Sequence, residues 1–446
     1  MTNQIRSGGT YLRLLAVPIA LVLPVAAVIA AGVIGWEYVI GAIALLSLVT
    51  AGLTDTRWII LSILAVFAIN HTSLIGGSPA TQIARWLVLG FAAVVALLRI
   101  LSDRPPRRFH SFDLLAIMFL ALCLASTSYS SDPSLTFQRA VSLVLLYLAV
   151  FWLGWDYANR DGSEAVVRLL IISATLIFGA SALYAFFPAA WQSNGRFMGV
   201  LPNPNTISLL VVTYLPLLIW GTFKYRSFWT LMVLIVAATA LVLSQSRNGL
   251  ISAAFGVVFL LWQVRPKRLV AIVSIALPIL VIVVATTSIE EIVLGAPVIG
   301  RFLDNAGGDI SSGRFQSWGS VLAQIQVRPL FGHGFGIDSL GLVQWSPGVT
   351  QFVGVHNTYL QILYQVGLVG VAFAFGPLLA LLGLSLTRSG IEELRLEHVL
   401  LTVLASGLVA AIFENWIFAV GNAFAFPFWI CVMLLLRVKW YADGVS

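Results

Sequence analysis

Long apolar runs fill most of the chain, and polar residues gather in the short segments between them. Each run has roughly 15 to 25 residues, enough for a helix to cross a hydrocarbon layer about 30 Å thick. The strict alternation of a membrane β-barrel is absent, and a helix satisfies its own backbone hydrogen bonds within a bilayer. The pattern predicts helices at residues 12–34, 36–53, 58–72, 83–101, 113–128, 138–155, 165–187, 205–222, 228–244, 248–263, 269–287, 357–386, 396–414 and 420–437.

These segments predict an all-α integral membrane protein with about 12–14 transmembrane helices, forming a single polytopic domain over residues 1–446. Residues 36–53 and 58–72 are short, and a re-entrant pair or one broken helix is the alternative for them. No small-residue cleavage site follows residues 12–34, so we interpret them as a retained helix and not as a removed signal peptide.

One segment departs from the apolar pattern. Residues 288–356 are polar and glycine-rich, and we expect them to form a loop subdomain outside the membrane. Within this loop, Arg314 precedes a short run that ends at Pro329 and whose apolar residues share one helical face. That face consists of Phe315, Trp318, Val321, Leu322 and Ile325. The run predicts an amphipathic helix lying on the outer surface.

Composition and charge agree with a membrane protein and add its orientation. The chain is 59% hydrophobic and only 10% charged, with a mean hydropathy of +0.97. If the N-terminus is cytoplasmic, eighteen of the 25 Lys and Arg residues fall on cytoplasmic segments, as the positive-inside rule requires. The net charge of +7 then indicates topology and anionic inner-leaflet lipid, not nucleic acid. Cys123 and Cys431 lie within predicted helices and indicate no disulfide framework.

The cations left on the opposite face are all arginines, namely Arg85, Arg139, Arg196, Arg247, Arg301, Arg314 and Arg328. Arginine suits planar, bidentate recognition of phosphate or carboxylate. Arg247 lies in a very short link between two helices, where it either binds an anion or extends to lipid headgroups. Arg314 stands in the first turn of the amphipathic helix, where the helix dipole disfavours a cation and a bound anion would relieve the conflict.

Two histidines and one acid complete the candidate chemistry. His356 and Asn357 begin the helix predicted at 357–386, so His356 is either a base able to take a proton near neutral pH or, like Asn357, a helix cap. His333 lies in the string Gly-His-Gly-Phe-Gly, which is typical of a flexible turn and, less often, of a substrate contact. Glu414, at the outer end of its predicted helix, either orients an arginine or sits at the membrane interface.

Several of these strings, in this order, resemble the O-antigen ligase and polymerase superfamily. The resemblance is carried by residues 195–205, 246–249, 312–318, 329–336, 356–360 and 367–370. It implies a glycosyltransferase with a GT-C-like fold in the bacterial cytoplasmic (inner) membrane, with both termini cytoplasmic and the active site on the periplasmic side. Such enzymes transfer a glycan from undecaprenyl diphosphate to lipid A–core, as ligases, or to a growing polysaccharide, as polymerases.

The resemblance also implies roles for single residues. The essential arginines of the family correspond to Arg196, Arg247 and Arg314, and its essential histidine to His356. We therefore predict His356, Arg247 and Arg314 as catalytic, and we predict diphosphate or glycan binding by Arg196, Arg301, His333, Asn357 and Glu414. The chain lacks a DxD pair and clustered carboxylates, so we expect neither a metal nor a cofactor. Displacement at the anomeric carbon would invert its configuration.

Other functions compete with the ligase. The same superfamily contains polymerases and protein O-glycosyltransferases, and the strings above do not separate them. A multi-helix transporter is the alternative from another class, although transporters carry ionisable residues near the bilayer midplane and the charges here cluster at helix ends. A scaffold for envelope glycans is the third, and it would leave each of these arginines dispensable.

Overall fold

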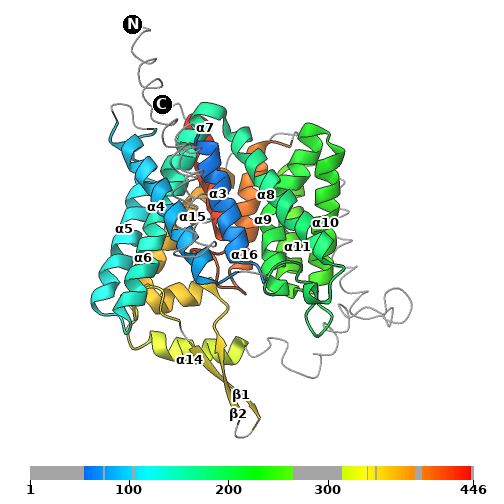
Figure 1. Ribbon diagram of the computed structural model, residues 1–446. Coiled ribbons are helices and arrows are strands. Elements are labelled where there is room, and N and C mark those ends of the chain that lie inside the picture. The colour runs from blue at the N-terminus through cyan, green and yellow to red at the C-terminus, as the bar shows by residue number, and fades with distance from the viewer. Residues whose placement is uncertain are drawn as a thin grey trace, which may run out of the picture.

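The computed structural model describes residues 55–73, 76–102, 106–264, 314–338, 340–346, 349–386 and 394–442 (Figure 1). Its helices are α3 (Thr56–Asn70), α4 (Pro79–Ile100), α5 (Ser111–Ala125), α6 (Pro133–Leu148), α7 (Trp155–Asp161), α8 (Ser163–Tyr184), α9 (Pro204–Tyr225), α10 (Phe228–Ser244), α11 (Arg247–Val264), α14 (Arg314–Ile325), α15 (Thr358–Leu386), α16 (Leu396–Ala410) and α17 (Ala425–Ala442). The strands are β1 (Leu340–Ser346) and β2 (Val349–Gly354). Short 3₁₀ turns follow α5 and α8, and a π-helix, Ala149–Gly154, joins α6 to α7.

The predicted helical framework is confirmed. Within the described residues, seven helical segments are long and apolar enough to cross a membrane, and α3, α10 and α16 are shorter apolar helices. The chain is thus a multi-pass membrane protein. The boundaries of α10 agree with the predicted 228–244, whereas α16 ends at Ala410 and not at 414. The helices predicted at 12–34, 36–53 and 269–287 lie outside the described residues.

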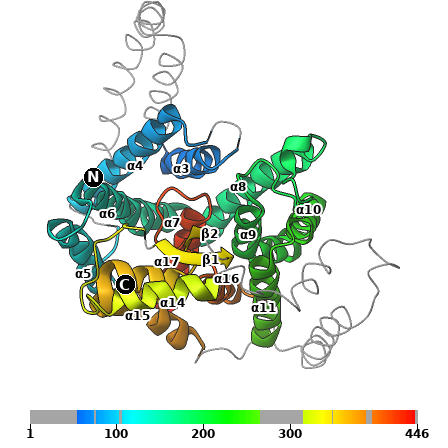
Figure 2. The same cartoon turned by 90° about the horizontal axis from the view of Figure 1, so that it is seen from below.

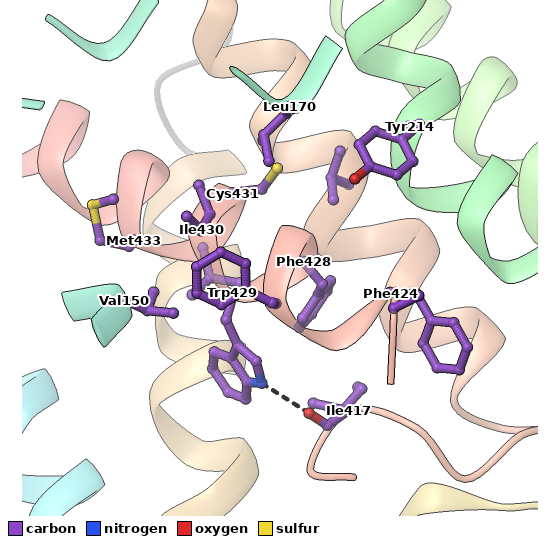
Figure 3. Packing of buried hydrophobic residues seen from close by; sticks show 14 of the residues in the cluster. Val150, Leu170, Tyr214, Ile417, Phe424, Phe428, Trp429, Ile430, Cys431 and Met433 are labelled. Atoms are coloured by element: carbon purple, nitrogen blue, oxygen red, sulfur yellow. Dashed lines mark hydrogen bonds between the residues drawn. The ribbon is translucent and has the colours of Figure 1, made fainter. Parts of the chain in front are cut away.

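Helix α17 is the centre of the bundle (Figure 2). Ile430, Cys431 and Met433 are completely buried, as are most residues around them. Figure 3 shows these side chains packed between residues of other helices, with Trp429 Nε1 donating to the Ile417 carbonyl at 2.8 Å. A helix that is apolar on every side is covered either by lipid or by protein, and here other helices surround it. The prediction of a helix at 420–437 placed its start too early, since the chain before Ala425 is irregular.

Polar residues followed by proline fix the start of several helices. The Asn203 side chain accepts from the Thr206 amide at 2.9 Å, with Pro204 at the first position of α9. Asp132 caps α6 in the same way, accepting from Leu135 at 3.0 Å. Such a cap satisfies an orphan amide, and proline there loses no hydrogen bond. This local signal determines where α9 begins and so where Asn205 lies.

Helix α15 is interrupted at Gly367, which has φ 66° and ψ −170°. The break leaves backbone groups on both sides of the glycine without helical partners, and the segment after α14 supplies them. The Pro329 carbonyl accepts from the Leu368 amide at 2.8 Å, and the Gly334 amide donates to the Gln365 carbonyl at 2.9 Å. The glycine-rich string around His333 is therefore a turn, as predicted, and the kink of α15 anchors it.

The strands β1 and β2 form an antiparallel hairpin in the loop predicted at 288–356, and Figure 1 shows it projecting from the end of the bundle. The predicted all-α membrane class is confirmed, and this hairpin is the one β-sheet among the described residues. Val, Trp, Thr and Phe in the two strands favour extended backbone, and the Pro-Gly pair between the strands favours a turn. Both signals are short and lie within a glycine-rich segment, so the sequence analysis did not predict the hairpin.

Helix α14 confirms the predicted amphipathic helix. Val321 and Ile325 are buried against Val355 and Tyr364, whereas Leu322 remains 46% exposed. The Trp318 indole donates to the Val355 carbonyl at 2.7 Å. The apolar face of α14 thus packs on the start of α15 and the end of the hairpin.

Candidate functional site

Glu414 is the centre of a polar cluster. It lies in the irregular segment between α16 and α17, and it is only 8% exposed. Its Oε1 accepts from Arg314 Nη2 at 3.1 Å and from Asn205 Nδ2 at 2.9 Å. Its Oε2 lies 3.1 Å from Nδ1 of His356. A buried carboxylate is stable only with such partners, and Glu414 draws them from α9, α14 and the start of α15.

The backbone around Glu414 is tied to α15 by the side chain of Thr358. The Thr358 hydroxyl donates to the Glu414 carbonyl at 2.7 Å and accepts from the Trp416 amide at 3.2 Å. The Thr358 amide donates to the Ala411 carbonyl at 2.9 Å. The end of α16 and the beginning of α15 are therefore one hydrogen-bonded unit, which fixes Glu414 relative to His356.

His356 and Asn357 have different roles. Asn357 is buried and caps α15, since its Oδ1 accepts from the Leu360 amide at 3.0 Å. His356 is not the cap, because its ring faces Glu414. Its side chain is 43% exposed, and its backbone has a φ of 44°, which is rare for a residue other than glycine. Backbone strain of this kind concentrates at functional sites.

The pairing with Glu414 also determines the tautomer of His356. An ionised carboxylate only accepts hydrogen bonds, so Nδ1 carries the proton at a distance of 3.1 Å. In the neutral imidazole the other nitrogen, Nε2, then has a lone pair. The half-exposed ring of His356 is thus arranged to accept a proton through Nε2.

Arg314 bridges two acceptors on the segment after α16. Its Nη1 donates to the Phe413 carbonyl at 2.6 Å and its Nη2 to Glu414. These bonds use two of the five N–H donors of a guanidinium. Arg314 begins α14, where the sequence predicted that a bound anion would relieve the unfavourable dipole. The Glu414 carboxylate of the protein itself supplies a negative charge at that position.

Arg196 reaches the same cluster from the loop before α9. Its Nε donates to the Ser244 carbonyl at 2.9 Å and its Nη2 to Asn205 Oδ1, also at 2.9 Å. The Asn205 amide thus joins Arg196 to Glu414, accepting from one and donating to the other. Sequence analysis did not select Asn205 as a site residue, although its place two residues after the cap Asn203 indicates the exposed end of a helix.

Arg247 is the first residue of α11 and is half-buried. The next residue, Asn248, donates from Nδ2 to the Ala410 carbonyl at 3.1 Å, which is the last residue of α16. Ser244, three residues before Arg247, accepts from Arg196. The start of α11 therefore lies beside the segment that carries Glu414.

The remaining predicted residues lie apart from the cluster or outside the described chain. His333 stacks on Tyr364, with ring centroids 4.6 Å apart, and its Nε2 lies 3.0 Å from the Gln324 carbonyl. The structure therefore does not bring His333 to Glu414. Arg301 lies outside the described residues. Glu414 is buried in contact with Arg314 and His356, which agrees with the expectation that it orients an arginine.

Comparison with known proteins supports the motif-based resemblance. Residues 230–375 match the family model described as O-antigen ligase, and this segment contains Arg247, Arg314 and His356. No curated protein sequence matches the chain. Together with the apolar helices, the family match supports a membrane protein of the O-antigen ligase/polymerase type. Residues 230–375 are thus similar to the O-antigen ligase family, in agreement with the resemblance inferred from the motifs.

Proposed function

We propose that this protein is a glycosyltransferase that transfers a glycan from undecaprenyl diphosphate to a hydroxyl of an acceptor. The contact between His356 and Glu414 carries the proposal, because it provides a base beside several arginines. The acceptor is lipid A–core in a ligase or the end of a growing polysaccharide in a polymerase. We place the reaction at the periplasmic face of the bacterial inner membrane. The positive-inside rule assigns the arginines of the cluster to that face.

The reaction begins at the acceptor hydroxyl. Nε2 of His356 takes its proton while the hydroxyl oxygen attacks the anomeric carbon of the donor. The Nδ1–H of the resulting imidazolium faces Glu414 Oε2, so a negative charge stabilises the positive charge that develops. A new bond forms from oxygen to the anomeric carbon, and the configuration at that carbon is inverted.

The bond from the anomeric carbon to the phosphate oxygen breaks in the same displacement. Undecaprenyl diphosphate leaves with the bonding electrons, and its negative charge needs compensation. Arg196 and Arg314 are anchored by protein acceptors, and Arg247 begins the neighbouring helix. Fixed guanidinium groups in a partly dry site stabilise such a charge without reorganising. Since arginines provide this compensation, we propose that the transfer does not depend on a metal.

The test is transfer of a labelled glycan from synthetic undecaprenyl diphosphate by the purified protein. Lipid A–core and a lipid-linked repeat are offered separately, and the wild type is compared with His356→Ala and Arg247→Ala. We expect transfer by the wild type to one acceptor, which names ligase or polymerase, and a large loss in both variants. An exposed arginine far from the cluster along the chain, Arg99→Ala, is the control. Full activity in both variants, or no transfer by the wild type, contradicts the proposal.

A further inference from the structure

A polar cavity of about 450 Å³ lies beside the cluster of Glu414. Its wall comes from α3, α4, α6 and α15, from the turn at 335–338 and from residues 415–422. Its volume is in the usual range of small-molecule sites. No step of the proposed transfer uses it.

Two buried polar atoms in the wall lack a partner. Arg85 Nε and Asn70 Oδ1 have no hydrogen-bond partner among the residues that the structure describes. Buried donors and acceptors are nearly always satisfied, so each unsatisfied one needs an explanation. One of these atoms is a donor and the other an acceptor, and both lie on the wall of the same cavity. A ligand group that both donates and accepts, such as a hydroxyl, is suited to them.

The rest of the wall favours a neutral polar ligand over an anion. Amide side chains predominate, from Asn70, Gln82, Gln138, Gln365, Asn415 and Asn422. The charged residues are Arg85, Arg139 and Asp338, and Arg139 already donates to Asp338 Oδ1 at 3.1 Å and to the Gly336 carbonyl. Trp86 adds an aromatic ring. Amides with one guanidinium whose Nε has no partner among the described residues match a ring that carries several hydroxyls, whereas a diphosphate would need more uncompensated cations.

The cavity and the cluster share two chain segments. Asn415 follows Glu414 directly and lines the cavity. Helix α15 begins next to His356 and contributes Ile362 and Gln365 to the wall two turns later. The cavity and the cluster are therefore built in part from the same two segments of the chain.

We propose that this cavity binds saccharide rings of the glycan substrate, with Arg85 and Asn70 as hydrogen-bonding residues and Trp86 as an apolar surface for a ring. The inference rests on the proposed function for the identity of the glycan. The donor glycan and the acceptor glycan share this chemistry. The experiment below distinguishes them.

Direct binding is measured by saturation-transfer NMR on the full-length protein in nanodiscs, without turnover. The probes are two lipid-free oligosaccharides, one with the structure of the core acceptor and one with that of the repeat unit. Arg85→Met and Asn70→Leu each remove one hydrogen-bonding group from the wall. The matched control, Arg99→Met, makes the same change as Arg85→Met near the other end of α4.

We expect each cavity variant to weaken one oligosaccharide roughly tenfold to a hundredfold, as for a lost hydrogen bond to a charged or buried group. The oligosaccharide whose binding weakens shows whether the cavity holds the donor glycan or the acceptor glycan. In the transfer assay, we expect the KM of that same substrate to rise while kcat is unchanged. Equal binding by wild type and both variants overturns the inference, as does an Arg85-dependent affinity for inorganic pyrophosphate but not for saccharide. Saccharide binding without any transfer by the wild type contradicts the proposed function and leaves the saccharide site intact.

Discussion

Glu414 Oε2 lies 3.1 Å from His356 Nδ1 although 58 residues separate them along the chain. The contact exists because Thr358 fastens the start of α15 to the segment that follows α16. Neither residue is interpretable alone. Glu414 would be an unexplained buried acid, and His356 would be one more polar residue at a helix end. Together they define the tautomer of His356, which leaves the lone pair of Nε2 for the proposed role as a base.

Substitution of Glu414 tests whether this contact orients the base. Glu414→Gln keeps the shape of the side chain but removes the negative charge beside the imidazole. We expect kcat for glycan transfer to fall roughly tenfold to a hundredfold, the worth of a charge-assisted hydrogen bond, with a smaller change in KM. His356→Ala is expected to fall by about 10²–10⁴ because the base itself is lost.

Glu414→Asp is the matched control for charge. It retains the carboxylate, and we expect it to recover part of the rate lost in Glu414→Gln. If Glu414→Gln is as active as the wild type while His356→Ala is inactive, the orienting role of Glu414 is wrong. Equal loss in Gln and Asp variants would indicate a structural role instead.

Replacing arginine with lysine tests whether shape as well as charge matters at Arg314 and Arg196. Each guanidinium contacts two acceptors at once, Phe413 and Glu414 in one case and Ser244 and Asn205 in the other. Lysine keeps the charge but lacks the planar fork. We expect Arg314→Lys and Arg196→Lys each to lower kcat/KM for the donor by about tenfold or more, the worth of one charge-assisted hydrogen bond.

The control for this pair is Arg328→Lys. Arg328 is exposed and donates to the Tyr129 carbonyl at 3.4 Å, away from Glu414. We expect it to keep its activity, as measured in the same transfer assay. Wild-type rates in both Arg314→Lys and Arg196→Lys would mean that positive charge alone suffices.

Sequence predicted the helical framework because length and apolarity alone determine which segments span a bilayer. It also selected Arg196, Arg314 and His356, three residues that the structure brings to one cluster. It did not show that Glu414 contacts these residues. The partners of Glu414 belong to separate elements, and spacing along the chain does not determine how far apart such elements lie in the fold. The capping role of Asn357 and the proposed base role of His356 also look alike in sequence, because both residues stand at one helix start.

Asn357 is expected to affect stability more than chemistry. Its side chain caps α15 by accepting from the Leu360 amide, and loss of such a cap costs about 0.5–2 kcal/mol. We expect Asn357→Ala to unfold at a lower temperature in detergent, whereas Asn357→Asp keeps an acceptor and stays close to wild type. A wild-type melting temperature with abolished transfer in Asn357→Ala would favour substrate binding by Asn357, as the sequence first suggested.

Removal of metal ions tests whether arginines alone compensate the negative charge of the leaving diphosphate. Among the described residues, no group of three or more His, Cys, Asp or Glu side chains is placed to hold a metal ion. We expect the transfer rate in excess EDTA to equal the rate without it, because the leaving diphosphate is met by guanidinium groups. If transfer is lost completely in EDTA and returns when magnesium or manganese is added, this expectation is wrong.

Gly367→Ala tests whether the break in α15 is required by the fold. Gly367 has a φ of 66°, and a Cβ there would overlap the Leu330 carbonyl and the Phe331 amide. The backbone conformation alone costs an alanine about 1–3 kcal/mol, because glycine almost alone adopts it, and the overlap adds about 1–3 kcal/mol. We expect a clear fall in the melting temperature and a loss of glycan transfer, because the turn at 329–334 is hydrogen-bonded to the break and His356 directly precedes the start of α15.

The control lies in the same helix. Gly376→Ala adds the same methyl group where nothing lies within 4 Å of it, and there we expect wild-type stability and activity. Equal stability of Gly367→Ala and Gly376→Ala would mean that α15 tolerates a continuous helix. The anchoring of the 329–334 turn by the break would then have no bearing on the position of His356.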